Sequence, residues 1–306
     1  MYLGIEIGGT KLQLGIGDGN GTVAALWRGT VVTADGADGI RRQITQAIPE
    51  LLASAKRRRE DLQGVGIGFG GPVDDATRTV IKSHQIQGWD GFPLADWIGE
   101  LVGLPAVLGN DADVAGLAEA LFGAGKGLTP IFYITIGSGI GGGLIINGEI
   151  YRGCGRGAAE IGHLRVHGSD LARLPLENFA SGWGIQEMYA QRTGLRPSPS
   201  AAQIARQAER NDEHARVVIG IAIDRLAECI CHAISLLCPR RFIIGGGVSL
   251  MGEEILFEPL RHLVAARVFG PFADCYDIVP AALGEEVVVH GALALARRKQ
   301  SEPNGT

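Results

Sequence analysis

Two segments in separate halves of the chain share one pattern, and this repetition constrains the fold more than any single motif. Residues 5–11 lead into the alternating run 12–16, and residues 134–139 lead into 141–146. Each segment predicts a strand, a glycine turn, a second strand and a hairpin turn, because apolar and polar residues alternate on both sides of the glycines. The alternative is that glycine-rich hairpins are common and match by coincidence. A true repeat predicts two related domains that face a shared cleft.

Composition narrows the class of protein. With 306 residues, the chain is long enough for about two domains of ~150 residues each. Its formal net charge of −5 gives no general attraction to nucleic acid or anionic lipid, so neither is an expected partner. We expect no secretory signal and no membrane-spanning segment, and the five cysteines show no disulfide framework. These features predict a cytoplasmic protein with free thiols.

Glycine is the unusual residue, with 47 of 306, about twice the share of ~7% in average proteins. The glycines cluster after β-rich runs, where a backbone without side chains can approach a ligand. Two clusters offer N–H groups to an anion, and a third could pack on adenine or ribose. None fits the Walker P-loop or the dinucleotide fingerprint, and each alone could be a structural turn. Together they indicate a nucleotide, and the candidate residues in these clusters are Gly8, Gly9, Thr10, Lys11, Gly137, Ser138, Gly139, Gly246 and Gly247.

Two acidic residues near these turns could serve phosphoryl transfer. Asp111 follows a short predicted strand and precedes a helix, a position from which a carboxylate can activate a hydroxyl as a general base. The alternative is that Asn110, Asp111 or Asp113 caps the helix. Glu6, beside the first glycine turn, could hold Mg²⁺ through water, and the alternative is a salt bridge with Lys11.

A further group of polar residues suits a sugar. Glu160, His163 and Glu177 could accept hydrogen bonds from adjacent hydroxyl groups and donate to them, and His84 is a weaker candidate of the same kind. The alternatives are a satisfied core or surface histidine at position 163 and a solvated charge at position 177.

Together these motifs resemble the ROK family of sugar kinases and repressors, and the resemblance covers nearly the whole chain. Residues 108–115 closely match the catalytic N-D-A motif, and residues 66–74 resemble a G-x-G-x-P-G-P-V-D loop with Gly70 where proline is usual. The other matching segments are two phosphate motifs, the segment before the sugar site and two sugar-contacting motifs, at residues 4–11, 134–143, 89–94, 159–163 and 176–182.

The resemblance implies an α/β fold of the hexokinase and actin-like ATPase class, which is ribonuclease H-like, with two domains around a central cleft. The expected domains are a small one over residues 1–113, completed by a C-terminal helix over 286–300, and a larger one over 114–285. Asp111 would take the proton of the 6-hydroxyl of a sugar. ATP and Mg²⁺ are the implied cofactors and a homodimer is the implied assembly. The other hydroxyls would be held by Asn110, Glu160, His163, Glu177 and the backbone near Gly71.

Two departures from the family pattern matter. Glu6 replaces the usual aspartate and lengthens that side chain by one methylene group. The family's zinc signature, a C-x-C-G-x-x-G-C run, is missing, because residues 167–177 contain no cysteine. Of the zinc ligands only His163 remains, so we expect no structural zinc, and packing or hydrogen bonds must order this loop.

The favoured interpretation is an ATP-dependent, glucokinase-like hexose kinase. N-acetylated hexosamines, fructose, mannose and allose remain alternative substrates, because specificity depends on loops that the sequence does not place. A sugar-responsive repressor is disfavoured, since the first phosphate motif begins at Gly4 and leaves no room for a helix-turn-helix domain. A non-catalytic sugar sensor is also disfavoured, because a mere binder gains little from a base such as Asp111.

Overall fold

The chain forms two compact units. The computed structural model describes residues 1–74, 76–83, 85–167 and 173–301. The first unit comprises Met1–Lys126, Gly148–Ala158 and Leu283–Thr306, and the second comprises Gly127–Asn147 and Ala159–Ala282. The predicted boundary after residue 113 falls inside helix α3 (Asp111–Phe122), and all of α3 belongs to the first unit.

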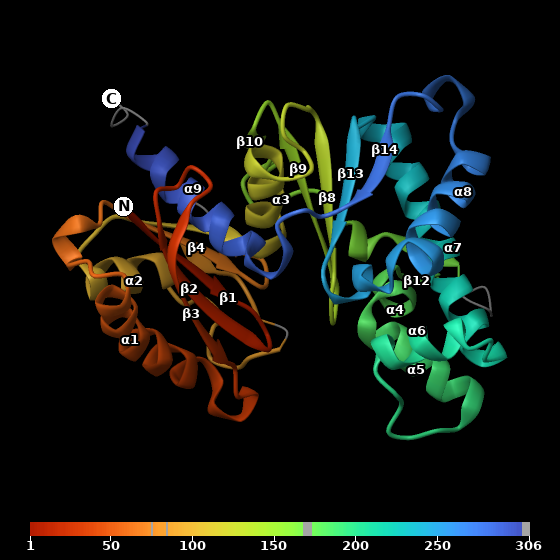
Figure 1. Ribbon diagram of the computed structural model, residues 1–306, viewed down its shortest axis with the longest axis horizontal. Coiled ribbons are helices and arrows are strands. Elements are labelled where there is room, and N and C mark those ends of the chain that lie inside the picture. The colour runs from red at the N-terminus through yellow and green to blue at the C-terminus, as the bar shows by residue number, and fades with distance from the viewer. Residues whose placement is uncertain (75, 84, 168–172, 302–306) are drawn as a thin grey trace. The chain divides into compact units, whose positions relative to one another are not determined.

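The first unit is built on a five-stranded sheet in the order β3-β2-β1-β4-β7 (Figure 1). β1 is antiparallel to β2 and parallel to β4, which in turn is parallel to β7. All residues of β1 and β4 are buried, as expected of central strands covered on both faces. The carboxyl ends of β1, β4 and β7 meet at one edge of the sheet. The strands are β1 (Tyr2–Ile7), β2 (Lys11–Gly17), β3 (Val23–Thr30), β4 (Val65–Phe69) and β7 (Ala106–Asn110), with a separate pair β5 (Val73–Asp74) and β6 (Thr79–Val80).

Helices cover both faces of this sheet. α1 (Gly36–Ser54) and α2 (Leu94–Val102) join the apolar side chains of one face in a single core, and α9 (Val287–Ser301) packs with α3 on the other face. Glycines line that second face: a Cβ at Gly66 would collide with the carbonyl oxygen of Ala292, and one at Gly4 would lie 3.0 Å from Leu293. Part of the glycine excess therefore serves close helix–sheet packing rather than ligand turns.

Helix α1 differs from the expected pattern. The sequence predicts a helical stripe interrupted at Pro49, but α1 continues through Pro49 to Ser54. Pro49 is exposed, so the carbonyl group of Thr45, which loses its intrahelical donor, faces solvent rather than the core. The side chain of Thr45 donates to the carbonyl of Arg41 at 3.0 Å.

The second unit repeats the arrangement around a sheet whose strands within the unit have the order β9-β8-β13-β14. β8 is antiparallel to β9 and parallel to β13, so the carboxyl ends of β8 and β13 again share one edge. The rings of Phe132 and Phe242 stack in its apolar core, with centroids 5.5 Å apart. The elements are β8 (Ile131–Ile136), β9 (Ile140–Ile146), β11 (Arg165–His167), β12 (Arg173–Pro175), β13 (Arg241–Gly245), β14 (Asp277–Pro280), α4 (Glu177–Ala180), α5 (Gly182–Thr193), α6 (Ala201–Glu209), α7 (Glu213–Leu237) and α8 (Glu258–Arg267).

The structure confirms the repeated strand–turn–strand pattern. β1 and β2 pair through the first glycine turn, and β8 and β9 pair through the second. The predicted hairpin turn at Asn147 and Gly148 also forms, with positive φ angles of 53° and 78°, and it leads to β10 (Glu149–Ile150) in the first unit.

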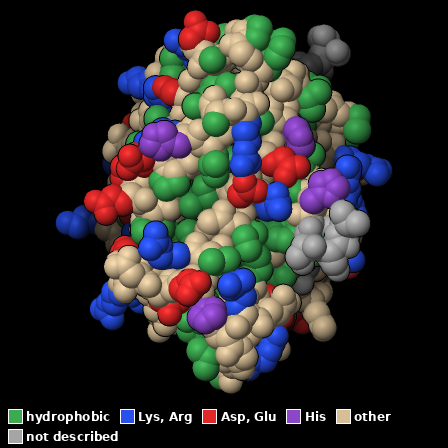
Figure 2. Space-filling view, turned by 90° about the vertical axis from the view of Figure 1, so that its right-hand side faces the viewer, with side chains coloured by type: hydrophobic (Ala, Val, Ile, Leu, Met, Phe, Trp, Pro, Cys, Tyr) green, Lys and Arg blue, Asp and Glu red, His purple; other side chains and the backbone are tan. Residues whose placement is uncertain are grey.

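Within the described ranges, no helix is both long and apolar enough to cross a membrane. Acidic and basic side chains are interspersed with apolar ones over the face that Figure 2 shows.

Candidate active site

The first glycine turn lies at the carboxyl edge of the first unit's sheet. The backbone N–H of Gly8 donates to the carbonyl of Lys11 at 3.0 Å, and the N–H of Gly70, after β4, donates to the carbonyl of Ile7 at 2.8 Å. A Cβ at Gly9 would collide with Oε1 of Gln85, so this side-chain amide lies directly on the turn. Sequence reasoning missed Gln85, although it follows the candidate His84. His84 itself lies outside the described residues.

Glu6 and Lys11 form an ion pair beside this turn. Nζ of Lys11 lies 3.1 Å from Oε1 of Glu6 and donates to the carbonyl of Glu285 at 2.9 Å. Burial raises the pKa of Glu6 to about 7, although Lys11 lowers it, and the nearby Asp111 raises it further. The salt bridge is therefore present, but it uses only one carboxylate oxygen. Oε2 of Glu6 is buried and has no hydrogen-bond partner among the described residues, which suits an oxygen ligand of hydrated Mg²⁺.

Asn110 and Asp111 lie at the junction of β7 and α3 and make different contacts there. Oδ1 of Asn110 accepts hydrogen bonds from the N–H groups of Ala112 at 2.9 Å and Asp113 at 3.3 Å, so Asn110 is the N-cap. Nδ2 of Asn110 donates to the carbonyl of Gly71 at 3.0 Å. One oxygen of Asp111 accepts from the N–H of Ala112, and the other would lie 3.4 Å from a Cβ at Gly70. That second oxygen therefore lies beside the loop that contacts the first glycine turn.

The second glycine turn occupies the corresponding edge of the second unit. The N–H of Gly137 donates to the carbonyl of Gly139 at 2.9 Å, and the N–H of Gly182, at the start of α5, donates to the carbonyl of Gly137 at 2.8 Å. Gly246 has a φ of 85°, and a Cβ there would lie 2.6 Å from the carbonyl oxygen of Ile136. The predicted nucleotide residues Gly137, Ser138, Gly139, Gly246 and Gly247 are thus brought together at one edge.

The predicted sugar residues of this unit lie close together. Glu160 precedes a single 3₁₀ turn (Ile161–His163), and Glu177 begins α4. Desolvation by surrounding atoms raises the pKa of Glu160, although much of its side chain stays exposed, and His163 lowers it while Glu177 raises it. A Cβ at Gly139 would lie 3.2 Å from Oε2 of Glu177. Glu177, a predicted sugar carboxylate, therefore lies beside the second glycine turn and close enough to Glu160 to act on it electrostatically.

Comparison with known proteins identifies the architecture. Residues 2–299 match the ROK family model. The chain belongs to the ROK family. A glucokinase of Streptomyces coelicolor is 31% identical over 321 residues, covering 97% of this chain and 98% of the relative. A ROK family glucokinase from Streptomyces griseus, solved in complex with glucose and AMPPNP, matches with a TM-score of 0.80 at 31% identity over 97% of this chain and 99% of the other.

The fold also matches a ROK hexokinase from Thermus thermophilus, with a TM-score of 0.83 at 24% identity over 99% of each chain. These matches confirm the predicted α/β fold of the hexokinase and actin-like class.

Sequence reasoning missed one more residue of this ROK protein. Glu119 is fully buried in α3; Oε1 accepts from the N–H of Leu283 at 2.9 Å, and Oε2 accepts from the N–H of Ala124 at 2.7 Å. Leu283 is where the chain re-enters the first unit, and Ala124 lies just before it leaves at Lys126. The carboxylate of Glu119 thus accepts hydrogen bonds from the backbone both where the chain leaves the first unit and where it re-enters. The available signal was a charged residue within an otherwise apolar helical stripe.

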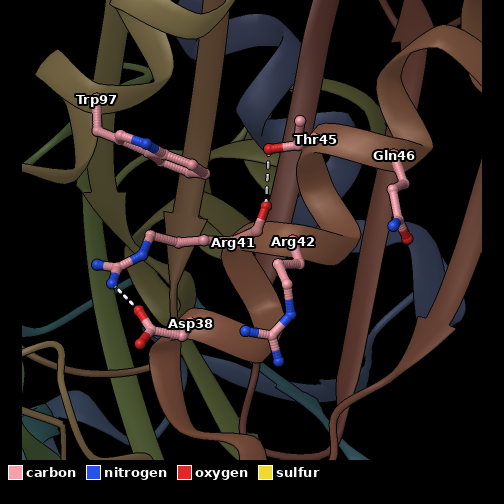
Figure 3. Close-up of a pocket in the computed structure, with 6 residues that line it drawn as sticks. All are labelled: Asp38, Arg41, Arg42, Thr45, Gln46 and Trp97. Atoms are coloured by element: carbon pink, nitrogen blue, oxygen red, sulfur yellow. Dashed lines mark hydrogen bonds and ion pairs between the residues drawn. The ribbon is translucent and has the colours of Figure 1, made fainter.

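A surface pocket of about 340 Å³ between α1 and α2 lies apart from these groups (Figure 3). Arg41 pairs with Asp38 there, and its guanidinium lies 4.5 Å from the ring centre of Phe92. None of the predicted site residues in the described ranges lines this pocket, which is formed by Asp38, Arg41, Arg42, Thr45, Gln46 and Trp97.

Proposed function

We propose that this ATP-dependent sugar kinase transfers the γ-phosphoryl group of ATP to the 6-hydroxyl of a hexose, with glucose as the preferred substrate. The observation that carries the proposal is the arrangement around Asp111. Asn110 caps α3, so the carboxylate of Asp111 is not needed as the cap, and one of its oxygens lies beside Gly70 and the first glycine turn. In this position Asp111 accepts the proton of the 6-hydroxyl as its oxygen attacks the phosphoryl group.

Carboxylates, an imidazole and an amide are the groups that hold the other sugar hydroxyls. In the second unit, the carboxylates of Glu160 and Glu177 accept hydrogen bonds, and the exposed His163 donates or accepts beside them. In the first unit, Asn110 and the backbone of Gly71, which are hydrogen-bonded to one another, complete the set. The glucokinases of Streptomyces coelicolor and Streptomyces griseus, each 31% identical to this chain, support glucose over fructose or an N-acetylhexosamine.

The glycine turns offer backbone N–H groups that donate hydrogen bonds to the phosphate oxygens of ATP, while Gly246 and Gly247 lie by the adenosine. Lys11 contributes positive charge beside the first turn. Oε2 of Glu6 would hold Mg²⁺ through water, and the ion would neutralise charge on the transferred group. The chain's own residues orient the sugar, take its proton and fix the phosphates.

A coupled assay of ADP release with ATP and Mg²⁺ over a panel of sugars tests this function. We expect the highest kcat/KM with glucose, no turnover of 6-deoxyglucose, and a product that carries phosphate at position 6. A higher kcat/KM with N-acetylglucosamine or fructose would show that this sugar, and not glucose, is the preferred substrate.

We also propose that the protein is a homodimer. Sedimentation velocity at micromolar protein would reveal the dimer, and a single monomer peak would contradict it.

A further inference from the structure

The structure brings two cysteines of the second unit together at the edge of the sheet opposite its glycine turns. Cys238 caps α7 just before β13, and Cys275 lies just before β14. The two strands are parallel, with Arg241 opposite Asp277, so the segments that enter them run side by side. The N–H of Asp277 donates to the carbonyl of Arg240 at 3.3 Å, and Nη1 of Arg240 donates to the carbonyl of Cys275 at 3.4 Å.

The two thiols lie near one another. The Cys275 thiol donates to Oδ1 of Asp274 at 3.8 Å, the Cys238 side chain is close enough to raise the pKa of Cys275, and both residues are partly exposed. The other cysteines are arranged differently: Cys229 is buried in α7, Cys231 lies 3.8 Å from the carbonyl of Val264, and Cys154 is exposed in the first unit. Two accessible thiols on adjoining segments that enter neighbouring parallel strands can be joined by a disulfide with little backbone movement.

We infer that Cys238 and Cys275 form a reversible disulfide when the protein meets a hydroperoxide. Cys238 as thiolate attacks one oxygen of hydrogen peroxide; an S–O bond forms, the O–O bond breaks and hydroxide leaves, giving a sulfenic acid. The thiolate of Cys275 then attacks that sulfur, the S–S bond forms, the S–O bond breaks and a second hydroxide leaves. With the two thiol protons, both hydroxides become water, so two thiols and one peroxide give one disulfide and two waters.

The surroundings of Cys275 suit it to the second step. Desolvation raises the pKa of Cys275, and Cys238 and the carboxylate of Asp274 raise it further. Cys275 is therefore less readily ionised than an ordinary cysteine, and the attack on peroxide is assigned to Cys238. The bond would join the end of α7 to the start of β14, at the opposite end of β13 from Gly246. We therefore expect it to stabilise the second unit while leaving kinase activity within about twofold of the reduced protein's.

The test uses the full chain treated with hydrogen peroxide and measured by intact mass. Wild type should lose 2 Da, and trypsin should yield one linked pair, residues 226–240 with 268–297. The thermal midpoint should rise by about 5–10 °C and return with dithiothreitol. Cys238→Ser and Cys275→Ser should each abolish both changes, whereas the matched control Cys154→Ser should keep them.

Two results would overturn the inference. One is a wild type that keeps its mass at peroxide concentrations where dimedone already labels Cys154. The other is a loss of 2 Da that persists in folded Cys238→Ser, since another pair would then be responsible.

Discussion

The two glycine turns share a backbone plan but have different surroundings. The first turn lies beside the ion pair of Glu6 with Lys11 and has the amide of Gln85 against Gly9. The second is hydrogen-bonded to the start of α5 and lies beside the carboxylate of Glu177. The two units also differ in the polar and charged residues that they bury. Among the described residues, the buried polar or charged residues of the first unit are Glu6, Gln13, Asp113 and Glu119, and that of the second is Ser181. Both units have an apolar core, but among the described residues the first unit also buries carboxylates, whereas the second does not.

The largest expected effect comes from removing the proposed base, Asp111, of the first unit. Asp111→Asn keeps the shape but cannot accept the proton, so we expect kcat to fall by about 10²–10⁴-fold. Sugar affinity should change little in calorimetry, because the substitution leaves the proposed sugar contacts of Glu160, Glu177 and Asn110 in place. The control Asp212→Asn, at the N-cap of α7, should leave kcat unchanged. Near-normal turnover in Asp111→Asn would remove Asp111 from the mechanism.

The sequence predicts the turns and the position of the candidate site well where local rules decide them. Asn147 and Gly148 form a turn because both adopt positive φ, and Asn110 and Asp111 reach the site because parallel strands end at one edge of a sheet.

Contacts between distant residues decide the rest. The first unit extends past residue 113 because α3 packs on α9, where a Cβ at Gly291 would collide with the backbone of Val114. The contact of Gln85 with Gly9 and the hydrogen bond from Leu283 to Glu119 likewise join segments that no local pattern pairs.

The buried charge of α3 gives the next largest effect, on stability. Glu119→Gln replaces one acceptor oxygen by an NH₂ group that meets the N–H of Leu283 or Ala124. We expect the free energy of unfolding to fall by about 3 kcal/mol, since a buried hydrogen bond to a charged group contributes ~1.5–3 kcal/mol. Urea denaturation measures this, with the exposed Glu100→Gln of α2 as the control. Equal stability of the two variants would contradict the role of Glu119.

Substitutions at the two turns should separate their functions. Gly9→Ala pushes Gln85 away and should raise the dissociation constant of ATP about tenfold, the effect of ~1.4 kcal/mol of crowding. The double variant with Gln85→Ala should recover most of this loss.

At the second turn, Gly139→Val crowds Glu177 as well, so it should weaken the binding of both ATP and glucose. Calorimetry that finds glucose affinity unchanged in Gly139→Val would show that the second turn does not couple the two ligands.

The raised pKa of Glu6 predicts a smaller effect that depends on pH. Because this pKa is about 7, the ionised fraction rises through neutrality, and the apparent Mg²⁺ affinity should improve about threefold from pH 6.5 to 7.5. Folding stability should show the opposite trend. The folded state binds the proton more tightly than the unfolded chain, so this contribution is complete below about pH 4.5 and is lost as pH rises through 7. Glu6→Gln should flatten both profiles, and an unchanged Mg²⁺ profile in that variant would exclude Glu6.

The smallest expected effect concerns metal in the second unit. A structural zinc site needs four ligands, usually thiolates and imidazoles in tetrahedral geometry. No cysteine lies between His163 and Glu177, and the described residues hold no group of three or more His, Cys, Asp or Glu placed to bind a metal. Without a thiolate pair, zinc affinity should be too low to stabilise the fold by linkage. EDTA followed by Mg²⁺ should therefore leave activity and the thermal midpoint unchanged, whereas EDTA alone should abolish activity by removing Mg²⁺. One zinc per chain in elemental analysis, lost together with activity that Mg²⁺ does not restore, would contradict this and make the second unit dependent on a metal.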